Sequence, residues 1–301
     1  MDRATVRGPQ SRKAGSERLA VERPTTTAAA PPAPLPDAGI QGPDTAFITS
    51  SIPHRMALAG GWIDQPFLSR HNPEPPGSMV VVALEPVGWF MDRCGMASST
   101  RRIATSLWNG ALPNRPREEL VRELYWAENA GKAEPSGSQD MIGLLYPGVS
   151  RLDYDARVDE GRFPAHIEST CDPEIARWVE SVVSLVPINQ RPAGYSPLGI
   201  RNLEPAWIAQ LGRTGKDCFD AILSTDIGRL GAAMNHCMRC WEAILPQTVQ
   251  HPVIPIDLKA ILCRFQSQYP GAMYSGCGGG YMIVVSEDPV PGSLRVRVRL
   301  G

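Results

Sequence analysis

The chain has 301 residues, and its 30 Lys and Arg residues against 31 Asp and Glu residues give a formal net charge of −1. A chain of this length can bury a substantial core without disulfide or metal crosslinks. A balanced charge provides no overall field that would draw the chain to nucleic acid or to an anionic membrane. No apolar run approaches the roughly 18 residues that a membrane helix needs. Seven scattered cysteines are typical of reduced thiols, so we expect a cytoplasmic protein with neither nucleic-acid nor membrane partners.

The first 45 residues differ in composition from the rest of the chain. They contain no aromatic residue, and residues 24–36 consist of Pro, Thr and Ala with a single leucine. Such a segment cannot bury enough apolar surface to offset the entropy lost when it is ordered. We predict that residues 1–45 form a disordered tail.

The remaining chain gives a mixture of strand and helix patterns. The apolar run at 79–84 is typical of a buried strand, and apolar residues recur with the helical period at 103–108 and 118–130. A loop rich in Pro and Gly is predicted at 190–197, and a last strand at 281–285 follows a glycine cluster. Further helices are predicted at 173–186, 204–211, 217–223, 227–245 and 258–269. This combination indicates an α+β fold.

Two segments rich in small residues are candidate phosphate sites. Four glycines lie among the six residues 275–280, and glycine lets the backbone adopt positive φ and lets another group approach closely. Residues 95–100 precede a predicted helix, whose first N–H groups and hydroxyls would suit an anion. Each segment has an alternative explanation, a tight turn without a ligand for the first and simple N-capping for the second.

Two further segments place an acid next to a turn. In residues 55–64 an apolar strand ends in a Gly-Gly turn that is followed by Asp64, and Asp140 follows the turn-forming residues 135–139. A carboxylate that opens a helix in a cleft can serve as a general base. It can equally be an N-cap for the apolar residues 141–145.

In chain order, these four segments resemble the motifs of the GHMP kinases, the family of galactokinase, homoserine kinase, mevalonate kinase and phosphomevalonate kinase. Residues 55–66 are similar to the first motif of the heptose-phosphate and fucose kinase branch, Leu-Gly-Gly-Gly-x-x-Asp-x-Pro. Residues 95–100 are similar to the phosphate loop Gly-Leu-Gly-Ser-Ser-Ala. Residues 137–140 match Gly-x-Gln-Asp, and residues 271–281 resemble the glycine-rich third motif. The resemblance covers about residues 46–300.

The resemblance implies a two-lobed α+β fold with mixed sheets and a helical C-terminal part. An N-terminal nucleotide and substrate lobe would occupy 46–164, and a C-terminal lobe with the glycine-rich motif would occupy 165–301. The implied activity is transfer of the γ-phosphate of ATP, with Mg²⁺, to a hydroxyl of a sugar or sugar phosphate. That small molecule would be the partner, and a homodimer is the oligomeric state we consider.

Position by position, the resemblance assigns roles to individual residues. Asp140 would be the catalytic base, and Arg55 would offset charge near the transferred group. Ser99 and Glu128 would bind Mg²⁺. The residues expected to hold the nucleotide are Gly95, Met96, Ala97, Ser98, Ser99, Gly276, Gly278 and Gly279. The residues expected to contact the substrate are Asp64, Trp62, Arg191 and Tyr195, with Trp62 suited to stacking on a sugar ring and Arg191 to a phosphate that the sugar already carries.

Two features differ from the family pattern. Only residues 85–94 separate the predicted strand at 79–84 from the phosphate loop, where the family has several strands, and Ala97 stands where that loop has a glycine. A non-glycine residue at positive φ costs about 1 kcal/mol or more. The shortened lobe keeps open an alternative function, a catalytically inactive protein of the same fold that binds a ligand or regulates a partner.

Overall fold

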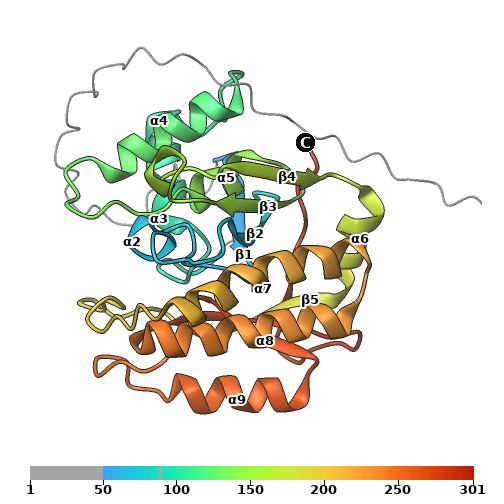
Figure 1. Cartoon of the computed structure of the whole chain (residues 1–301). Coiled ribbons are helices and arrows are strands. Elements are labelled where there is room, and N and C mark those ends of the chain that lie inside the picture. Colours follow the sequence, from blue (N-terminus) through green and yellow to red (C-terminus); the bar gives the residue numbers. More distant parts are fainter. Residues whose placement is uncertain (1–49, 88–89) are drawn as a thin grey trace, which may run out of the picture.

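Two four-stranded sheets organise residues 50–87 and 90–301, the part of the chain that the computed structural model describes (Figure 1). Helices flank and separate the sheets, so the expected α+β class is confirmed. Every strand pairing in the described part of the chain is antiparallel. The expectation of mixed sheets is therefore wrong. The expected tail at 1–45 lies outside the described residues.

The first sheet is built around a strand that is buried along its whole length. Its strands are β1 (His54–Ala57), β2 (Gly77–Leu84), β3 (Val149–Tyr154) and β4 (His166–Thr170), in the order β1-β2-β3-β4. All eight residues of β2 are buried, as the apolar run at 79–84 predicts. β1 and β3 pair with the two edges of β2, and the carbonyl oxygen of Ala83 near its end accepts a hydrogen bond from outside the sheet.

The second sheet contains the glycine-rich segment. Its strands are β5 (Val183–Asn189), β6 (Gly271–Gly276), β7 (Gly279–Val285) and β8 (Leu294–Arg295), in the order β6-β7-β5-β8. The last predicted strand, 281–285, is the buried C-terminal part of β7. Residues 277 and 278 form the tight turn between β6 and β7, so the glycine cluster ends one strand and starts the next.

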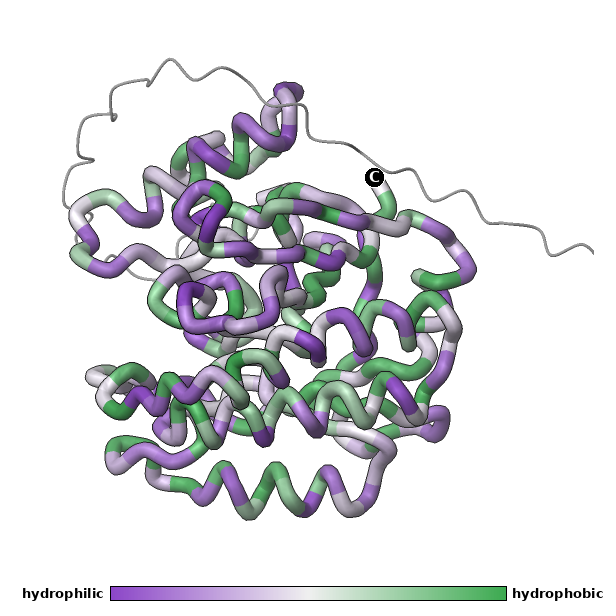
Figure 2. Tube along the Cα trace, viewed as in Figure 1, coloured by the Kyte–Doolittle hydropathy of each residue, from purple (hydrophilic) through white to green (hydrophobic). Residues whose placement is uncertain are grey.

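Helices of the first half of the chain lie by the first sheet, and a second group of helices follows in the second half (Figure 1). The first group is α2 (Pro66–Ser69), α3 (Ser98–Leu107), α4 (Arg117–Asn129) and α5 (Gln139–Leu145). The second group is α6 (Pro173–Val182), α7 (Pro205–Leu223), α8 (Ile227–Ile244) and α9 (Leu258–Gln268). Single 3₁₀ turns occupy Asp159–Gly161 and Pro246–Thr248. Hydrophobic and hydrophilic residues alternate along α8 and α9 in Figure 2, as expected of helices with one apolar face.

Three predicted helices differ substantially from the structure. The helix predicted at 173–186 ends at Val182, because residues 183–186 pair with β7 as the start of β5. The helices predicted at 204–211 and 217–223 are one helix, α7, which continues through Gly212 and Gly215. Glycine normally weakens a helix, but here both glycines lie where α7 approaches β2, so tertiary packing outweighs the local preference.

The glycines of α7 permit backbone-to-backbone contact with the central strand. A Cβ atom on Gly212 would lie 2.8 Å from the Cα of Gly77, and one on Gly215 would overlap the carbonyl oxygen of Ser78. The other side of α7 packs along α8, which in turn packs on β6. The helix pair therefore connects the two sheets. The absence of side chains at Gly212 and Gly215 sets the distance of α7 from β2.

The last residues of the chain return to the first sheet. After β8 pairs with β5, the N–H of Arg299 donates to Ala83 O at 2.9 Å, and the N–H of Gly148 donates to Arg299 O at 2.7 Å. Residues near 298 thus lie between the end of β2 and the start of β3. The expected lobe boundary at 164/165 stays a prediction; β4, just after it, belongs to the first sheet. In the described part of the chain, no helix combines the length and apolar character needed to span a membrane.

We predict that Gly215→Ala lowers the free energy of unfolding by about 1–3 kcal/mol, because the added methyl overpacks the α7–β2 contact. Gly228→Ala in α8 is the matched control, since its nearest atom outside the chain neighbours, Asp226 Oδ1, would be 3.5 Å from the new Cβ. That change should be neutral or stabilising by up to about 1 kcal/mol. Urea unfolding measures both values. Equal stability of the two variants would contradict the packing explanation.

Candidate active site

Asp140 lies at the start of α5 and is held by two other segments of the chain. Its carboxylate forms an ion pair with Nη2 of Arg55 in β1 and accepts a hydrogen bond from Oγ1 of Thr100 in α3 at 3.2 Å. The Arg55 side chain is 5% exposed and that of Asp140 is 23% exposed. Asp140 therefore keeps an accessible face beside a buried cation. Because the carboxylate serves these contacts, its role is not confined to capping α5, which has no side-chain cap.

A glycine in α5 makes room for Arg55. A Cβ atom on Gly143 would overlap the Cγ atom of Arg55, so the arginine stem lies directly over the helix backbone. From there, Nη1 of Arg55 reaches the carbonyl oxygen of Gly95 at 3.4 Å. The same guanidinium thus contacts the helix that carries the acid and the loop expected to bind phosphate.

Asp64 lies beneath the turn that precedes α5. It is completely buried, and Gly137 packs so closely that a Cβ atom there would overlap its carboxylate. Nε2 of Gln139 donates to Oδ1 at 3.4 Å, while Oδ2 has no hydrogen-bond partner in the described part of the chain. Burial, aided by the charge of Asp140 and opposed by Arg55, raises the pKa of Asp64 to about 7. A substrate could touch this expected ligand only if the turn at Gly137 moved.

Glu128, near the end of α4, is a second buried acid. Its side chain is 9% exposed, Nζ of Lys132 lies 3.7 Å from Oε1, and Oε2 has no partner among the described residues. Burial and the charge of Asp140 raise the pKa of Glu128, and the hydroxyl of Thr100 and the charge of Lys132 oppose that rise. Thr100 therefore lies next to both Glu128 and Asp140.

Thr100 is the site residue to which the sequence analysis gave no role. The family resemblance directs attention to the hydroxyl of Ser99, one position earlier in the phosphate loop. Because α3 begins at Ser98, Ser99 and Thr100 point in directions about 100° apart on the helix. Thr100 is buried against the acids, whereas Ser99 is exposed. A correct prediction of the first residue of α3 would have shown that the hydroxyls of Ser99 and Thr100 point in different directions.

The phosphate loop rests on the turn between β6 and β7. Gly95 has a φ of +79°, and a Cβ atom on Gly276 would lie 2.7 Å from its Cα. Ser275 Oγ donates to the carbonyl oxygen of Cys94 and accepts from the N–H of Tyr281 at 2.9 Å. The two glycine-containing segments, far apart in sequence, therefore meet without intervening side chains.

Two residues of the loop have conformations that bear on a ligand. Ala97 adopts left-handed φ and ψ of 54° and 29° directly before α3, which has no side-chain cap. Because no side chain caps α3, the N–H groups of its first turn remain available to other acceptors. Met96, expected among the nucleotide-binding residues, has a fully buried side chain. It can contact a ligand through its backbone only.

The remaining expected residues fall into different places. Arg191 and Tyr195 line a cavity of about 230 Å³ together with Ser98 and Ser99, on the loop side of α3. Trp62 packs edge-on against Phe67 and Trp241, with ring centroids 6.5 and 6.4 Å apart. A Cβ atom on Gly278 would lie 2.7 Å from the Tyr195 ring, and one on Gly279 would overlap Asn189. The structure thus brings Arg191 and Tyr195 to the phosphate loop and not to Asp64.

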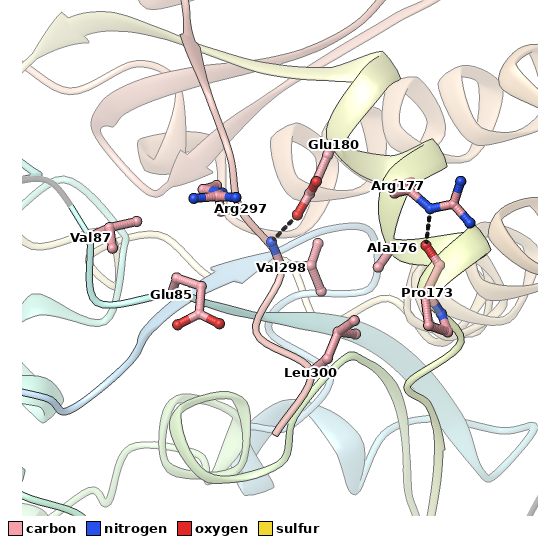
Figure 3. A pocket seen from close by; sticks show the side chains of 9 residues that line it. All are labelled: Glu85, Val87, Pro173, Ala176, Arg177, Glu180, Arg297, Val298 and Leu300. Carbon is pink, nitrogen blue, oxygen red and sulfur yellow. Dashed lines mark hydrogen bonds between the residues drawn. The ribbon is translucent and has the colours of Figure 1, made fainter.

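A larger cavity, of about 520 Å³, lies elsewhere, between α6, the end of β2 and the C-terminal residues (Figure 3). It contains none of the expected site residues. Glu180 at its wall accepts a hydrogen bond from the N–H of Val298 at 2.7 Å, and Arg177 donates to Pro173 O at 3.1 Å. Both side chains support the surrounding backbone.

Comparison with known proteins identifies the fold. No family model matches the sequence, and a search of curated proteins gives no significant match. Among solved structures, galactokinase from Lactococcus lactis, complexed with galactose, has a TM-score of 0.58 at 12% identity, with 82% of this chain and 92% of that chain covered. A mevalonate kinase has a TM-score of 0.53 at 12% identity, with 82% and 98% covered.

A D-glycero-D-manno-heptose 1-phosphate kinase from Bacteriodes thetaiotaomicron has a TM-score of 0.51 at 11% identity, with 82% of this chain and 94% of that chain covered. The chain therefore has the fold of the GHMP kinases, as the four sequence motifs imply, and these three structural neighbours are small-molecule kinases. At these identities the likeness establishes the fold and leaves the activity to be argued from the site.

The buried Asp64 predicts a specific dependence of stability on pH. The folded state holds the Asp64 proton up to about pH 7, whereas the unfolded state releases it near 3.8. The contribution of Asp64 to the free energy of unfolding is therefore fully present below about pH 4 and decreases as pH rises towards 7. Asp64→Asn removes this decrease. The free energy of unfolding of the variant, relative to that of the wild type, should therefore rise between pH 4 and 8 by on the order of 2–4 kcal/mol.

Urea unfolding at a series of pH values measures this difference. Asp288→Asn, at an exposed position, is the control and should track the wild type throughout. A constant difference between Asp64→Asn and the wild type from pH 4 to 8 would show that Asp64 titrates as an ordinary carboxyl.

Proposed function

We propose that this protein is an ATP-dependent kinase that phosphorylates a hydroxyl of a sugar or sugar phosphate, with Asp140 as its catalytic base. The observation that carries the proposal is the position of Asp140, which is paired with the buried Arg55 and bonded to Thr100 beside the phosphate loop. The kinase fold adds support, because this arrangement links the three motifs that the family resemblance associates with phosphoryl transfer.

In the proposed reaction, the accessible face of Asp140 accepts the proton of the acceptor hydroxyl. The hydroxyl oxygen forms a bond to the γ-phosphorus of ATP, and the bond from that phosphorus to the β–γ bridging oxygen breaks, with its electron pair leaving on ADP. Arg55 fixes the direction of the carboxylate and offsets negative charge near the reacting phosphoryl group, since its other terminal nitrogen faces Gly95 O. The 23% exposure of Asp140 is enough for a hydroxyl to reach it.

The residues at the site fit the Mg²⁺ ion that accompanies ATP. Oε2 of Glu128 is buried without a hydrogen-bond partner in the described part of the chain, and the Thr100 hydroxyl lies beside it. Mg²⁺ commonly takes one or two carboxylates together with substrate phosphates. Glu128 and Thr100 would hold the ion, which would neutralise phosphate charge. Ser99, the hydroxyl implied by the resemblance, faces the arginine-lined cavity.

We place the acceptor at the accessible face of Asp140. Asp64 Oδ2 and Gln139 Oε1, beside the turn at Gly137, are buried polar atoms without partners among the described residues. A movement of that turn would open them to a polar occupant with several hydrogen-bonding groups, and a sugar provides such groups. All seven cysteines are free thiols, which supports a cytoplasmic location.

The direct test is phosphoryl transfer by the purified full chain with ATP and Mg²⁺. The acceptor panel should include galactose, mevalonate and heptose phosphates, chosen from the names of the structural neighbours. Formation of a phosphorylated acceptor, followed by ³¹P NMR, supports the proposal. Binding of ATP or a sugar without any transfer would instead support the catalytically inactive binding protein.

Asp140→Asn should lower kcat by about 10²–10⁴ with little change in KM for ATP, because it keeps the shape of the side chain and removes its basicity. Asp159→Asn is the matched control. Asp159 also pairs with an arginine, Arg122, but on the surface, at 3.1 Å with both side chains half exposed. Wild-type turnover by folded Asp140→Asn protein would exclude Asp140 as the base.

The two neighbouring hydroxyls of α3 should differ in their effect on the metal. We expect Thr100→Val and Glu128→Gln each to raise the Mg²⁺ concentration for half-maximal activity by about tenfold or more, and Ser99→Ala to change it by less than about threefold. Mn²⁺ binding followed by electron paramagnetic resonance gives a readout independent of turnover. A larger effect of Ser99→Ala than of Thr100→Val would instead support Ser99 as the metal ligand, as the resemblance implies.

A further inference from the structure

The 230 Å³ cavity beside the phosphate loop contains an excess of positive charge. Three arginines line it against one carboxylate, and the hydroxyls of Ser98 and Ser99 complete its polar wall; the charged residues are Arg93, Arg102, Arg191 and Asp92. These arginines come from the loop before α3, from α3 itself and from the loop after β5. Segments from both halves of the chain therefore present guanidinium groups to one small volume.

Two of the guanidinium groups are fixed by reciprocal contacts with backbone. Nε of Arg191 donates to Arg93 O at 2.9 Å, and Nη2 of Arg93 donates to Pro192 O at 2.8 Å. The N–H of Arg93 also donates to Oγ of Ser98 at 3.1 Å, which connects the two contacts to the start of α3. The groups are thus held in place before a ligand arrives, which reduces the entropy cost of binding.

The contacts leave most of the donors of these arginines available. A guanidinium has five N–H donors. Within residues 50–87 and 90–301, Arg191 uses Nε and one bond from Nη1 to Cys277 Sγ at 3.4 Å, and Arg102 binds Asp92 through Nη2 at 2.8 Å. An anion with many oxygens, each able to accept several hydrogen bonds, matches this set of free donors.

We propose that Arg93 and Arg191, assisted by Arg102, form a clamp for the phosphate chain of the phosphoryl donor, so that the donor is recognised at this cavity through its phosphates. The inference rests on the proposed kinase function and reassigns Arg191, which the sequence analysis placed with the acceptor. The cavity is smaller than the roughly 300 Å³ at which sites for drug-sized ligands begin. It suits a compact phosphate chain better than a whole nucleotide.

The connection to the acid cluster favours the donor over a phosphorylated acceptor. Ser99 lines the cavity, and the next residue, Thr100, binds Asp140. Consecutive residues of α3 therefore face the cavity and the proposed base, and the uncapped first turn of that helix, which suits a phosphate, lies between them. The acceptor is proposed at the accessible face of Asp140.

The test is isothermal titration calorimetry of the full chain with inorganic triphosphate, without a nucleoside and without turnover. We expect triphosphate to bind the wild type, with an affinity that falls as salt rises. Arg191→Gln should weaken binding at least about tenfold and Arg93→Gln at least about threefold, because each removes a charge-assisted donor set. Arg177→Gln is the matched control, since Arg177 also donates Nε to a backbone carbonyl but is 72% exposed on α6; it should bind as the wild type does.

Competition identifies which ligand uses the clamp. Displacement of triphosphate by ATP but not by adenosine or galactose 1-phosphate supports the donor assignment. Displacement by galactose 1-phosphate and not by ATP overturns it, as does unchanged triphosphate binding by both folded variants or no binding by the wild type. Should Arg191→Gln unfold the protein, triphosphate binding by Arg93→Gln and Arg102→Gln tests the clamp. A clamp that binds triphosphate in a protein without phosphoryl transfer would reject the proposed function and retain the anion site.

Discussion

The ion pair between Arg55 and Asp140 is the interaction on which the proposed site depends. A guanidinium buried to this degree is stable only when its charge is paired. Arg55 meets that demand with Asp140 and donates its other terminal nitrogen to Gly95 O, while its Nε has no partner among the described residues. These contacts join β1, α5 and the phosphate loop at one point. Burial raises the pKa values of Asp64 and Glu128, and the charge of the same carboxylate adds to both rises.

Close backbone contacts bring the segments of the site together. The phosphate loop rests on the turn between β6 and β7 through Gly95 and Gly276, and Gly143 and Gly137 admit Arg55 and Asp64. Each glycine removes a side chain where two functional groups would otherwise be kept apart. This explains why the motifs can be found in sequence: their glycines mark close approaches, while the polar residues beside them carry the chemistry.

Much of the fold could be predicted from the sequence, because long apolar runs such as that of β2 and the periods of α8 and α9 are determined locally. The errors occur where tertiary contacts decide. Local propensity alone ends a helix before Gly212 and Gly215, and residues 183–186 continue an apolar helical pattern until the pairing with β7 is known. Within the site, the four motifs predict Arg55 and Asp140 but not the separate directions of Ser99 and Thr100, nor the place of Arg191, because these follow from the first residue of α3 and from a loop contact distant in sequence.

The return of the C-terminal residues to the first sheet has a consequence for the order of folding. Ala83 and Gly148 are synthesised well before Arg299, yet their backbone groups are bonded to it in the folded protein. The end of β2 near Ala83 therefore lacks this hydrogen-bond partner until the residues around Arg299 have joined the sheet. Because such non-local contacts slow folding, closure of the first sheet would be a late step of folding, and a partly folded chain would expose this strand end to chaperones until then.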